Sequence, residues 1–211
     1  MAGRIEVRLS GSGGQGLILA GIILAEASIN DGMNSVHTQS YGAQSRGGHS
    51  RSDVVISEGA IDFPHVAAAD VLLTMSQEAA KVYAPLVKPE AVVVVDSTYV
   101  DAVVPPSGAR VYRIPISRLA RIELGKEMAA NMVALGAMNA LSHLVTPGSL
   151  RQAVLDRVPR GTQELNLRAL DLGASAAREA SSQVDTEARP RKSGALAGVM
   201  MTGASAGKII T

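Results

Sequence analysis

The stretch that decides the fold is Ile5–Ala27, "IEVRLSGSGGQGLILAGIILAEA". Ile5, Val7 and Leu9 alternate with charged residues, which predicts a β-strand. A glycine-rich turn follows, and the apolar run behind it predicts a widely buried helix over Gln15–Asn30. A strand, a glycine turn and a helix in this order predict the first unit of an α/β domain.

The remainder of the chain alternates in the same way. We expect further strands at 34–41, 53–57, 70–76, 91–97 and 109–116. We expect helices that begin at Ser76 or cover Lys126–Val145, Gly148–Val158 and 163–183. The β-branched run at 91–97 is typical of a central parallel strand covered on both faces. The alternation predicts an α/β fold with a mostly parallel sheet and right-handed crossovers.

The composition narrows the function classes. The 211 residues include 20 basic and 19 acidic side chains, and the formal net charge of +1 gives no general attraction to nucleic acid or membrane. Aromatic residues make up 2% of the chain, which disfavours a base-stacking surface. Without cysteine, the chain cannot hold an iron–sulfur cluster or supply a catalytic thiol. It shows neither a signal peptide nor a membrane span, so we expect a cytoplasmic protein.

The glycine-rich turn has the G-x-G-x-x-G spacing of loops that hold phosphate groups. In such a loop Gly11 allows a tight turn, Gly13 lets the backbone approach a phosphate, and Gly16 packs the helix against the strand. The free N–H groups of the helix N-terminus favour an anion. The candidate binding residues are therefore Gly11, Ser12, Gly13, Gly14, Gln15 and Gly16. A tight turn without a ligand has the same pattern and stays an alternative.

The sequence argues against a dinucleotide in this loop. NAD sites carry an acidic residue at the end of the second strand, where it binds the ribose hydroxyls. The corresponding stretch, Ser35–Tyr41, has no carboxylate, and Asp31 lies at the preceding helix end. The G-K-[ST] signature of a P-loop is also missing. A free-standing dinucleotide-binding protein remains as an alternative function.

A second polar stretch, "GAQSRGGHSRS" at 42–52, follows the second predicted strand. Its arginine is suited to bidentate binding of a phosphate or carboxylate. Its place after that strand favours the same carboxyl edge of the sheet as the glycine-rich turn. We therefore add Arg46, Gly47 and Gly48 to the candidate binding residues, with a solvated surface hairpin as the alternative.

The other polar residues carry weaker signals. Asn131, Asn139 and His143 fall on one broad face of a predicted helix, where burial against a neighbouring element is the preferred interpretation. No metal-ligand spacing, carboxylate pair or Ser–His–Asp arrangement stands out. We predict no catalytic residue and no metal ligand in this chain.

Four stretches together resemble the gamma subunit of 2-oxoacid:ferredoxin oxidoreductases, which is an internal domain in single-chain pyruvate enzymes. They are "LSGSGGQGLILAGIILAEA" (9–27), "SYGAQSRGGHSRSDVVIS" (40–57), "ADVLLTMSQEA" (69–79) and "NMVALGAMNAL" (131–141). The resemblance covers about residues 4–168. It implies a Rossmann-like three-layer domain, which we assign to residues 1–184. A C-terminal tail, 185–211, is rich in small and apolar residues, and we expect it to pack on partner subunits.

The resemblance also implies a function. Enzymes of this family decarboxylate a 2-oxoacid on thiamine diphosphate, pass electrons to iron–sulfur clusters and ferredoxin, and transfer the acyl group to coenzyme A. Thiamine diphosphate, magnesium and the clusters are expected in alpha- and beta-type partner subunits. This chain would help to bind coenzyme A at the subunit interface and to close the active site. A purely architectural subunit with an empty glycine loop is the remaining alternative.

The particular 2-oxoacid is less clearly indicated. The segments "SYGAQSRGG" (40–48) and "MSQEA" (75–79) are similar to those of 2-oxoglutarate enzymes, which makes 2-oxoglutarate the first choice. Phenylglyoxylate, indolepyruvate and branched-chain 2-oxoacids stay open.

Overall fold

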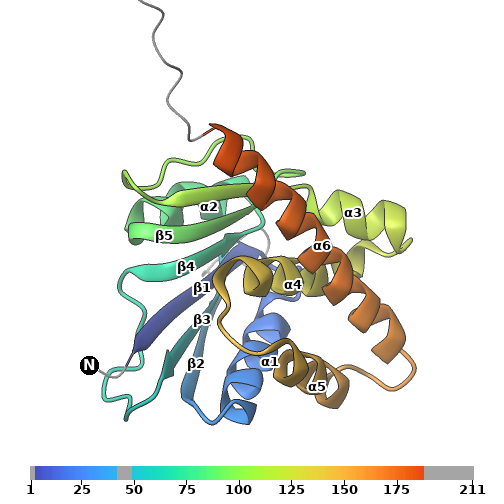
Figure 1. Ribbon diagram of the computed structural model, residues 1–211, viewed down its shortest axis with the longest axis horizontal. Helices are drawn as coiled ribbons and strands as arrows, with labels where there is room; N and C mark the ends of the chain where they lie inside the picture. Colours follow the sequence, from blue (N-terminus) through green and yellow to red (C-terminus); the bar gives the residue numbers. More distant parts are fainter. Residues whose placement is uncertain (1–2, 42–48, 188–211) are drawn as a thin grey trace, which may run out of the picture.

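The computed structural model describes residues 3–41 and 49–187, and these form a mixed six-stranded sheet in the order β2-β3-β1-β4-β5-β6 (Figure 1). Neighbours pair in parallel from β1 through β4 and β5 to β6, whereas β3 runs antiparallel to both β1 and β2. The mostly parallel sheet is confirmed, and β5 is the central parallel strand expected from its β-branched run. The strands are β1 (Arg4–Ser12), β2 (Asn34–Tyr41), β3 (His49–Ser57), β4 (Ala69–Thr74), β5 (Val87–Asp96) and β6 (Arg110–Ile114).

Helices cover both faces of this sheet, so the three-layer fold is also confirmed. α1, α4, α5 and α6 bury their apolar side chains against one face, and α2 packs on the other (Figure 1). The helices are α1 (Leu17–Asn30), α2 (Gln77–Tyr83), α3 (Ile116–Glu123), α4 (Ala130–Ser142), α5 (Pro147–Arg157) and α6 (Gln163–Glu187), with short 3₁₀ turns η1 (Ala84–Leu86) and η2 (Glu127–Ala129).

The predicted elements between β5 and α5 need correction. The strand expected over 109–116 ends at Ile114, and Ile116 already begins α3, a helix that the sequence pattern missed. Pro115 has the fixed φ that a helix start accepts, and Ile116 and Ala120 then fall on its buried side. The helix expected over Lys126–Val145 is shorter, because η2 precedes α4 and the left-handed His143 follows it.

The small residues of the core let α4 and α6 come into backbone contact. A Cβ on Gly136 of α4 would overlap the carbonyl oxygen of Leu170. A Cβ on Gly173 of α6 would overlap the carbonyl oxygen of Val133. Each helix therefore needs a glycine at the crossing, and the two helices are locked together along their contact.

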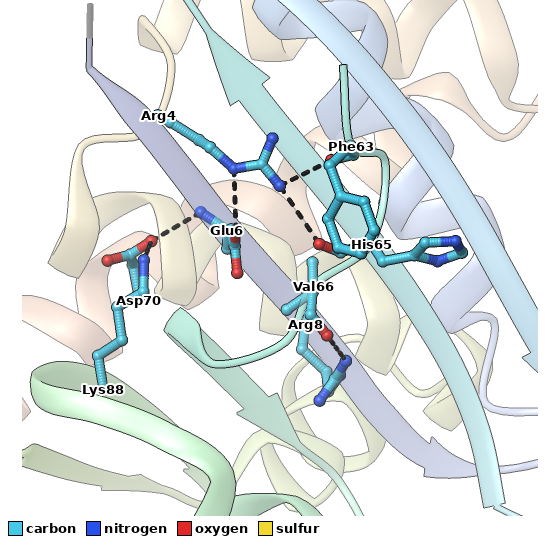
Figure 2. A network of polar contacts seen from close by, with 8 residues as sticks. All are labelled: Arg4, Glu6, Arg8, Phe63, His65, Val66, Asp70 and Lys88. Atoms are coloured by element: carbon cyan, nitrogen blue, oxygen red, sulfur yellow. Dashed lines mark hydrogen bonds and ion pairs between the residues drawn. The ribbon is translucent and has the colours of Figure 1, made fainter. Parts of the chain in front are cut away.

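A buried ion pair connects β1 and β3 on the face that α2 covers. The Nε and Nη2 atoms of Arg8 each lie 2.8 Å from a carboxylate oxygen of Asp53. Nη2 also donates to the carbonyl oxygen of Val66 (2.6 Å; Figure 2), and the guanidinium carbon lies 5.0 Å from the ring centroid of Tyr83. The charged positions that alternate along β1 are therefore not a solvent-facing stripe, because the second helix layer buries Arg8.

The amino end of β1 is tied to the segment that leads into β4. Arg4 donates to the carbonyl oxygens of Phe63 (2.8 Å) and His65 (3.2 Å), and its Nε pairs with Glu6 at 2.9 Å (Figure 2). The backbone N–H of Glu6 donates to Asp70 (2.8 Å). These contacts fix the amino edge of the sheet, opposite the edge where the glycine loop emerges.

Candidate functional site

The glycine loop lies at the point where the chain changes its winding direction across the sheet. β1 and β4 are neighbours, but α1 leads from β1 toward β2 and α2 leads from β4 toward β5, on the opposite side. Open α/β sheets bind ligands in the crevice at the carboxyl ends of two such strands. A cavity of about 210 Å³ lies there, lined by Gly14, Gln15, Met75, Ser117, Glu127, Met128 and Ala130.

Gly11 does not make the tight turn that the motif predicted. β1 continues through Gly11 and Ser12, which pair with Ser50 and His49 of β3, so the turn starts only at Gly13. Gly11 contributes in another way, since a Cβ there would overlap the Oε1 atom of Gln15 and displace that side chain. The glycine makes room for a side chain of the loop itself.

The amide of Gln15 closes the loop from inside. Its Oε1 accepts a hydrogen bond from the backbone N–H of Ser12 (2.7 Å), and its Nε2 donates to the carbonyl oxygen of Met75 (3.0 Å). Gln15 therefore ties the end of β1 to the segment after β4. Both ends of this amide are used within the protein, so Gln15 shapes the loop.

Gly16 sets the start of α1 in a left-handed conformation, with φ of 72°. The nearest atoms to a Cβ at Gly16 belong to Asn131 of α4, with Nδ2 at 2.5 Å, and not to the strand of the predicted contact. That Nδ2 donates to the carbonyl oxygen of Gly16 (3.2 Å). The two residues are 115 positions apart, so no local pattern relates them.

The N-terminus of α1 is open toward the carboxyl edge. No side chain of the described residues caps it, and the first backbone bond of the helix runs from the N–H of Ala20 to the carbonyl oxygen of Gly16 (3.1 Å). The N–H groups that precede Ala20 in the first turn therefore have no intrahelical acceptor. Together with the dipole of α1 they favour an anion at this position.

The second candidate loop starts and ends beside the first. Tyr41 and His49, the described residues on either side of 42–48, lie at the ends of β2 and β3, and His49 pairs with Ser12 of β1. The expected common edge is confirmed for these flanking residues. Arg46, Gly47 and Gly48 lie outside the described residues.

The carboxylates near the cavity are engaged within the chain. The carboxylate of Asp96, fully buried, accepts from the N–H (3.2 Å) and the Oγ (2.6 Å) of Ser117. Glu127 accepts a hydrogen bond from the hydroxyl group of Tyr99, and its other carboxylate oxygen lies 3.5 Å from Nη1 of Arg121. The hydrogen bond to Glu127 is the main cause that raises the pKa of Tyr99 above its ordinary value. The negative charge of this wall is thus partly balanced before any ligand arrives.

Residues 3–41 and 49–187 contain neither a metal-ligand cluster nor a membrane-spanning helix. No group of three or more His, Cys, Asp and Glu side chains in these ranges is arranged to hold a metal ion. No helix there is long and apolar enough to cross a membrane.

Comparison with known proteins gives consistent matches. Residues 6–176 match the model of the family described as pyruvate ferredoxin/flavodoxin oxidoreductase. The 2-oxoglutarate synthase subunit KorC of Methanocaldococcus jannaschii is 45% identical over 178 residues, which is 83% of this chain and 95% of that protein.

Two solved structures share the fold. The gamma subunit of the keto/oxoacid ferredoxin oxidoreductase from Geobacter sulfurreducens superposes with a TM-score of 0.78 at 45% identity, over 85% of this chain and 99% of that subunit. The 2-oxoglutarate:ferredoxin oxidoreductase of Magnetococcus marinus, with 2-oxoglutarate, coenzyme A and succinyl-CoA bound, gives 0.75 at 26% identity, over 83% of this chain and 31% of that one.

Proposed function

The chain belongs to the pyruvate ferredoxin/flavodoxin oxidoreductase family, and on that premise we propose that it is the gamma-type subunit of a 2-oxoglutarate:ferredoxin oxidoreductase. Its length supports this role, because it covers 95% of a curated 2-oxoglutarate synthase subunit and 99% of a solved gamma subunit. The choice of 2-oxoglutarate rests on the names of several relatives that are 37–45% identical. Other 2-oxoacids have less support: the ketoisovalerate oxidoreductase subunits are 31–33% identical.

We propose that the redox and decarboxylation chemistry resides in partner subunits. This chain has no cysteine to hold an iron–sulfur cluster, which supports a place for the clusters in other subunits. We assign thiamine diphosphate and magnesium to the same alpha- and beta-type subunits, with ferredoxin as electron acceptor and the cytoplasm as location. The isolated chain should show no oxidoreductase activity with any 2-oxoacid. Activity above trace level in the purified chain would contradict this division of labour.

The open glycine loop beside the 210 Å³ cavity is the observation that carries the coenzyme A proposal. Sites that enclose a whole small molecule have volumes of about 300–1,000 Å³. The cavity therefore suits one part of coenzyme A, and we assign it a phosphate group facing the first-turn N–H groups of α1. The rest of the ligand would lie against a partner subunit, which fits a site that closes only in the assembly.

The structure gives two physical reasons to set the dinucleotide alternative aside. β3 lies between β1 and β2, so the end of β2 is two strand spacings, about 10 Å, from β1. An acidic residue on β2 would be too far away to bind a ribose held at the glycine loop. Asp31 is engaged elsewhere, since its carboxylate accepts from the N–H of Thr146 (2.6 Å) and the hydroxyl of Ser149 (2.5 Å).

The test is steady-state kinetics of the assembled enzyme with coenzyme A varied and the 2-oxoacid saturating. Arg46→Ala should raise the apparent KM for coenzyme A about 10- to 150-fold, the loss expected for one charge-assisted hydrogen bond. Arg168→Ala is the matched control, because Arg168 is an exposed arginine on α6. Equal KM values for coenzyme A in the two variants would indicate that Arg46 does not bind the ligand, and would favour the architectural alternative.

We also propose that the tail over 185–211 packs on partner subunits. The family match ends at residue 176, α6 continues to Glu187, and residues 188–211 lie outside the described part of the chain. Limited proteolysis should remove this segment from the lone chain and spare it in the assembly. Equal protection in both forms would contradict the proposal.

A further inference from the structure

α4 carries two buried asparagines whose environments are closely matched. Asn131 and Asn139 are each 6% exposed, and each amide contacts backbone groups through both of its polar atoms. Asn139 donates to the carbonyl oxygen of Val145 (3.0 Å) and accepts from its N–H (3.1 Å). Asn131 accepts from the N–H of Met132 (2.9 Å) and donates to the carbonyl oxygen of Gly16 (3.2 Å).

The two side chains differ in what they hold. Asn139 fixes the connection between α4 and α5, whereas Asn131 holds the turn that opens α1 at the candidate site. We infer that Asn131 is a positioning residue for coenzyme A: it fixes the peptide that aims the first N–H groups of α1 at the ligand. This inference rests on the proposed function and adds a residue to it that no part of the glycine motif contains.

The planarity of the peptide bond carries the argument. The carbonyl group of Gly16 and the N–H group of Leu17 belong to one planar unit, so a partner that holds the carbonyl also sets the direction of the N–H. The carbonyl oxygen already accepts from the N–H of Ala20 within the helix. Asn131 occupies a second acceptor position of the same oxygen, from a different element, and so restricts rotation of this peptide.

Both partners are held in place for this contact. Asn131 lies between the buried residues Ala130 and Met132, so its backbone is anchored in the core. Gly16 has no Cβ, and any Cβ would lie 2.5 Å from the Asn131 Nδ2. The hydrogen bond therefore requires glycine at one position and a short amide side chain at the other. Gln15 and Ala130, the chain neighbours of Gly16 and Asn131, line the 210 Å³ cavity, so this contact lies directly behind lining residues.

The experiment compares Asn131→Ala with Asn139→Ala in the assembled oxidoreductase. Asn131→Ala should raise the KM for coenzyme A about 2- to 12-fold, the effect of one neutral hydrogen bond, with kcat and the KM for the 2-oxoacid unchanged. Asn139→Ala should lower the melting temperature of the assembled enzyme and leave the KM for coenzyme A unchanged. Equal changes of this KM in both variants, or no change in Asn131→Ala, would overturn the positioning role.

A second variant covers failure of Asn131→Ala to assemble. Asn131→Asp keeps the side-chain volume and the oxygen that accepts from Met132, but it removes the donor to Gly16 and places a negative charge beside the anion position. Its KM for coenzyme A should exceed that of the wild type by at least as much. An unchanged KM in this variant would equally overturn the inference.

The outcome also separates this inference from the proposed function. If Arg46→Ala raises the KM for coenzyme A and the Asn131 variants do not, the loop binds the ligand without help from α4 and only the positioning role fails. If none of these substitutions changes the KM, the glycine loop does not bind coenzyme A and the proposed site fails with it.

Discussion

The N-termini of α1 and α3 border the same cavity but are completed in different ways. Gly14 and Gln15 precede α1, and Ser117 lies in the first turn of α3. At α3 the buried carboxylate of Asp96 accepts from the backbone and the hydroxyl of Ser117. At α1 no side chain within residues 3–41 and 49–187 accepts from the first-turn N–H groups. The same edge of the sheet therefore holds one helix start that the chain fills with its own anion and one that it leaves open.

α5 and α2 follow the pattern of α3. The carboxylate of Asp31 accepts from Thr146 at the start of α5, and the Oγ of Ser76 accepts from the N–H of Ala79 in α2 (3.3 Å). At α2, α3 and α5 a side chain of the protein therefore accepts from the start of the helix. The open start of α1 is the exception among these four helices, which agrees with a ligand supplied from outside.

The largest effect on stability is expected at the filled site. Asp96→Ala leaves the N–H and Oγ of Ser117 and the N–H of Thr98 without their acceptor, and should cost about 2–5 kcal/mol of unfolding free energy. Asp96→Asn should cost less, because one side-chain oxygen still accepts. Urea unfolding of the full chain measures both. A loss of unfolding free energy below about 1 kcal/mol in Asp96→Ala would contradict the conclusion that Asp96 stabilises the start of α3.

Gly16→Ala tests the open turn itself. Alanine there must adopt φ of 72° and meet Asn131, so the loss should be about 2–3 kcal/mol. Gly32→Ala is the matched control, since Gly32 has φ of 81° and no atom within 4 Å of its Cβ position, and should lose only about 1–2 kcal/mol. Equal losses would mean that the contact with Asn131 has no energetic weight. In a background that carries Asn131→Ala, the loss caused by Gly16→Ala should be smaller, whereas the loss caused by Gly32→Ala should stay the same.

The carboxylate at α5 gives a pH-dependent effect. Burial opposes ionisation of Asp31, but hydrogen bonds from Ser149 and Thr146 outweigh it and lower the pKa of Asp31. A depressed pKa stabilises the fold above the unfolded-state value and loses this effect as pH falls through the folded-state value. Asp31→Asn should therefore cost about 1 kcal/mol near neutral pH. The difference from wild type should shrink in acid unfolding curves as the pH falls below the ordinary pKa of an aspartate and through the lowered folded-state pKa, and a constant difference would contradict this role.

Ser76→Ala removes the cap of α2 and should cost about 1 kcal/mol, because the N–H of Ala79 loses its side-chain acceptor. The KM of the assembled enzyme for coenzyme A should stay at the wild-type value. Thermal unfolding and coenzyme A kinetics on one preparation measure both quantities. A raised KM would show that the ligand contacts the start of α2 as well.

The smallest effect on stability is expected at Gly13. Its Cβ position has no atom within 4 Å and its φ is not positive, so Gly13→Ala should change stability by less than about 0.5 kcal/mol. The added methyl group would stand where the ligand approaches, and the KM for coenzyme A should rise about tenfold, or about 1.4 kcal/mol. A variant that is both stable and kinetically normal would argue that the open turn is empty.

The sequence predicted the fold where local pattern determines it. Alternating and β-branched runs located β1 and β5, and the glycine turn located the start of α1. It failed where partners are distant: Arg8 pairs with Asp53 from 45 positions away, and Asn131 reaches Gly16 from 115. β2 and the second half of β3 were predicted, whereas residues 49–52 were assigned to the polar loop but belong to β3, where they pair with β1 and β2. The order of these strands beside β1 depends on tertiary packing.

The same limit applied to the candidate site. Gly11 and Gly16 were correctly marked as positions that need glycine, but the reasons were different, because the atoms that exclude a side chain belong to Gln15 and to Asn131. The motif describes backbone conformation and says nothing about which neighbour approaches. Arg46 stays a prediction from the sequence.

The glycine contacts between α4 and α6 have a mechanical consequence. Gly136 and Gly173 bring the backbones of the two helices into direct contact. Because protein interiors are close-packed, a shift of one helix requires a shift of the other. α6 lies on one side of this contact, and on the other side α4 carries Asn131, which donates to the carbonyl oxygen of Gly16. A displacement of α6 would therefore be passed through α4 to Asn131 and to the carbonyl oxygen of Gly16 that it holds.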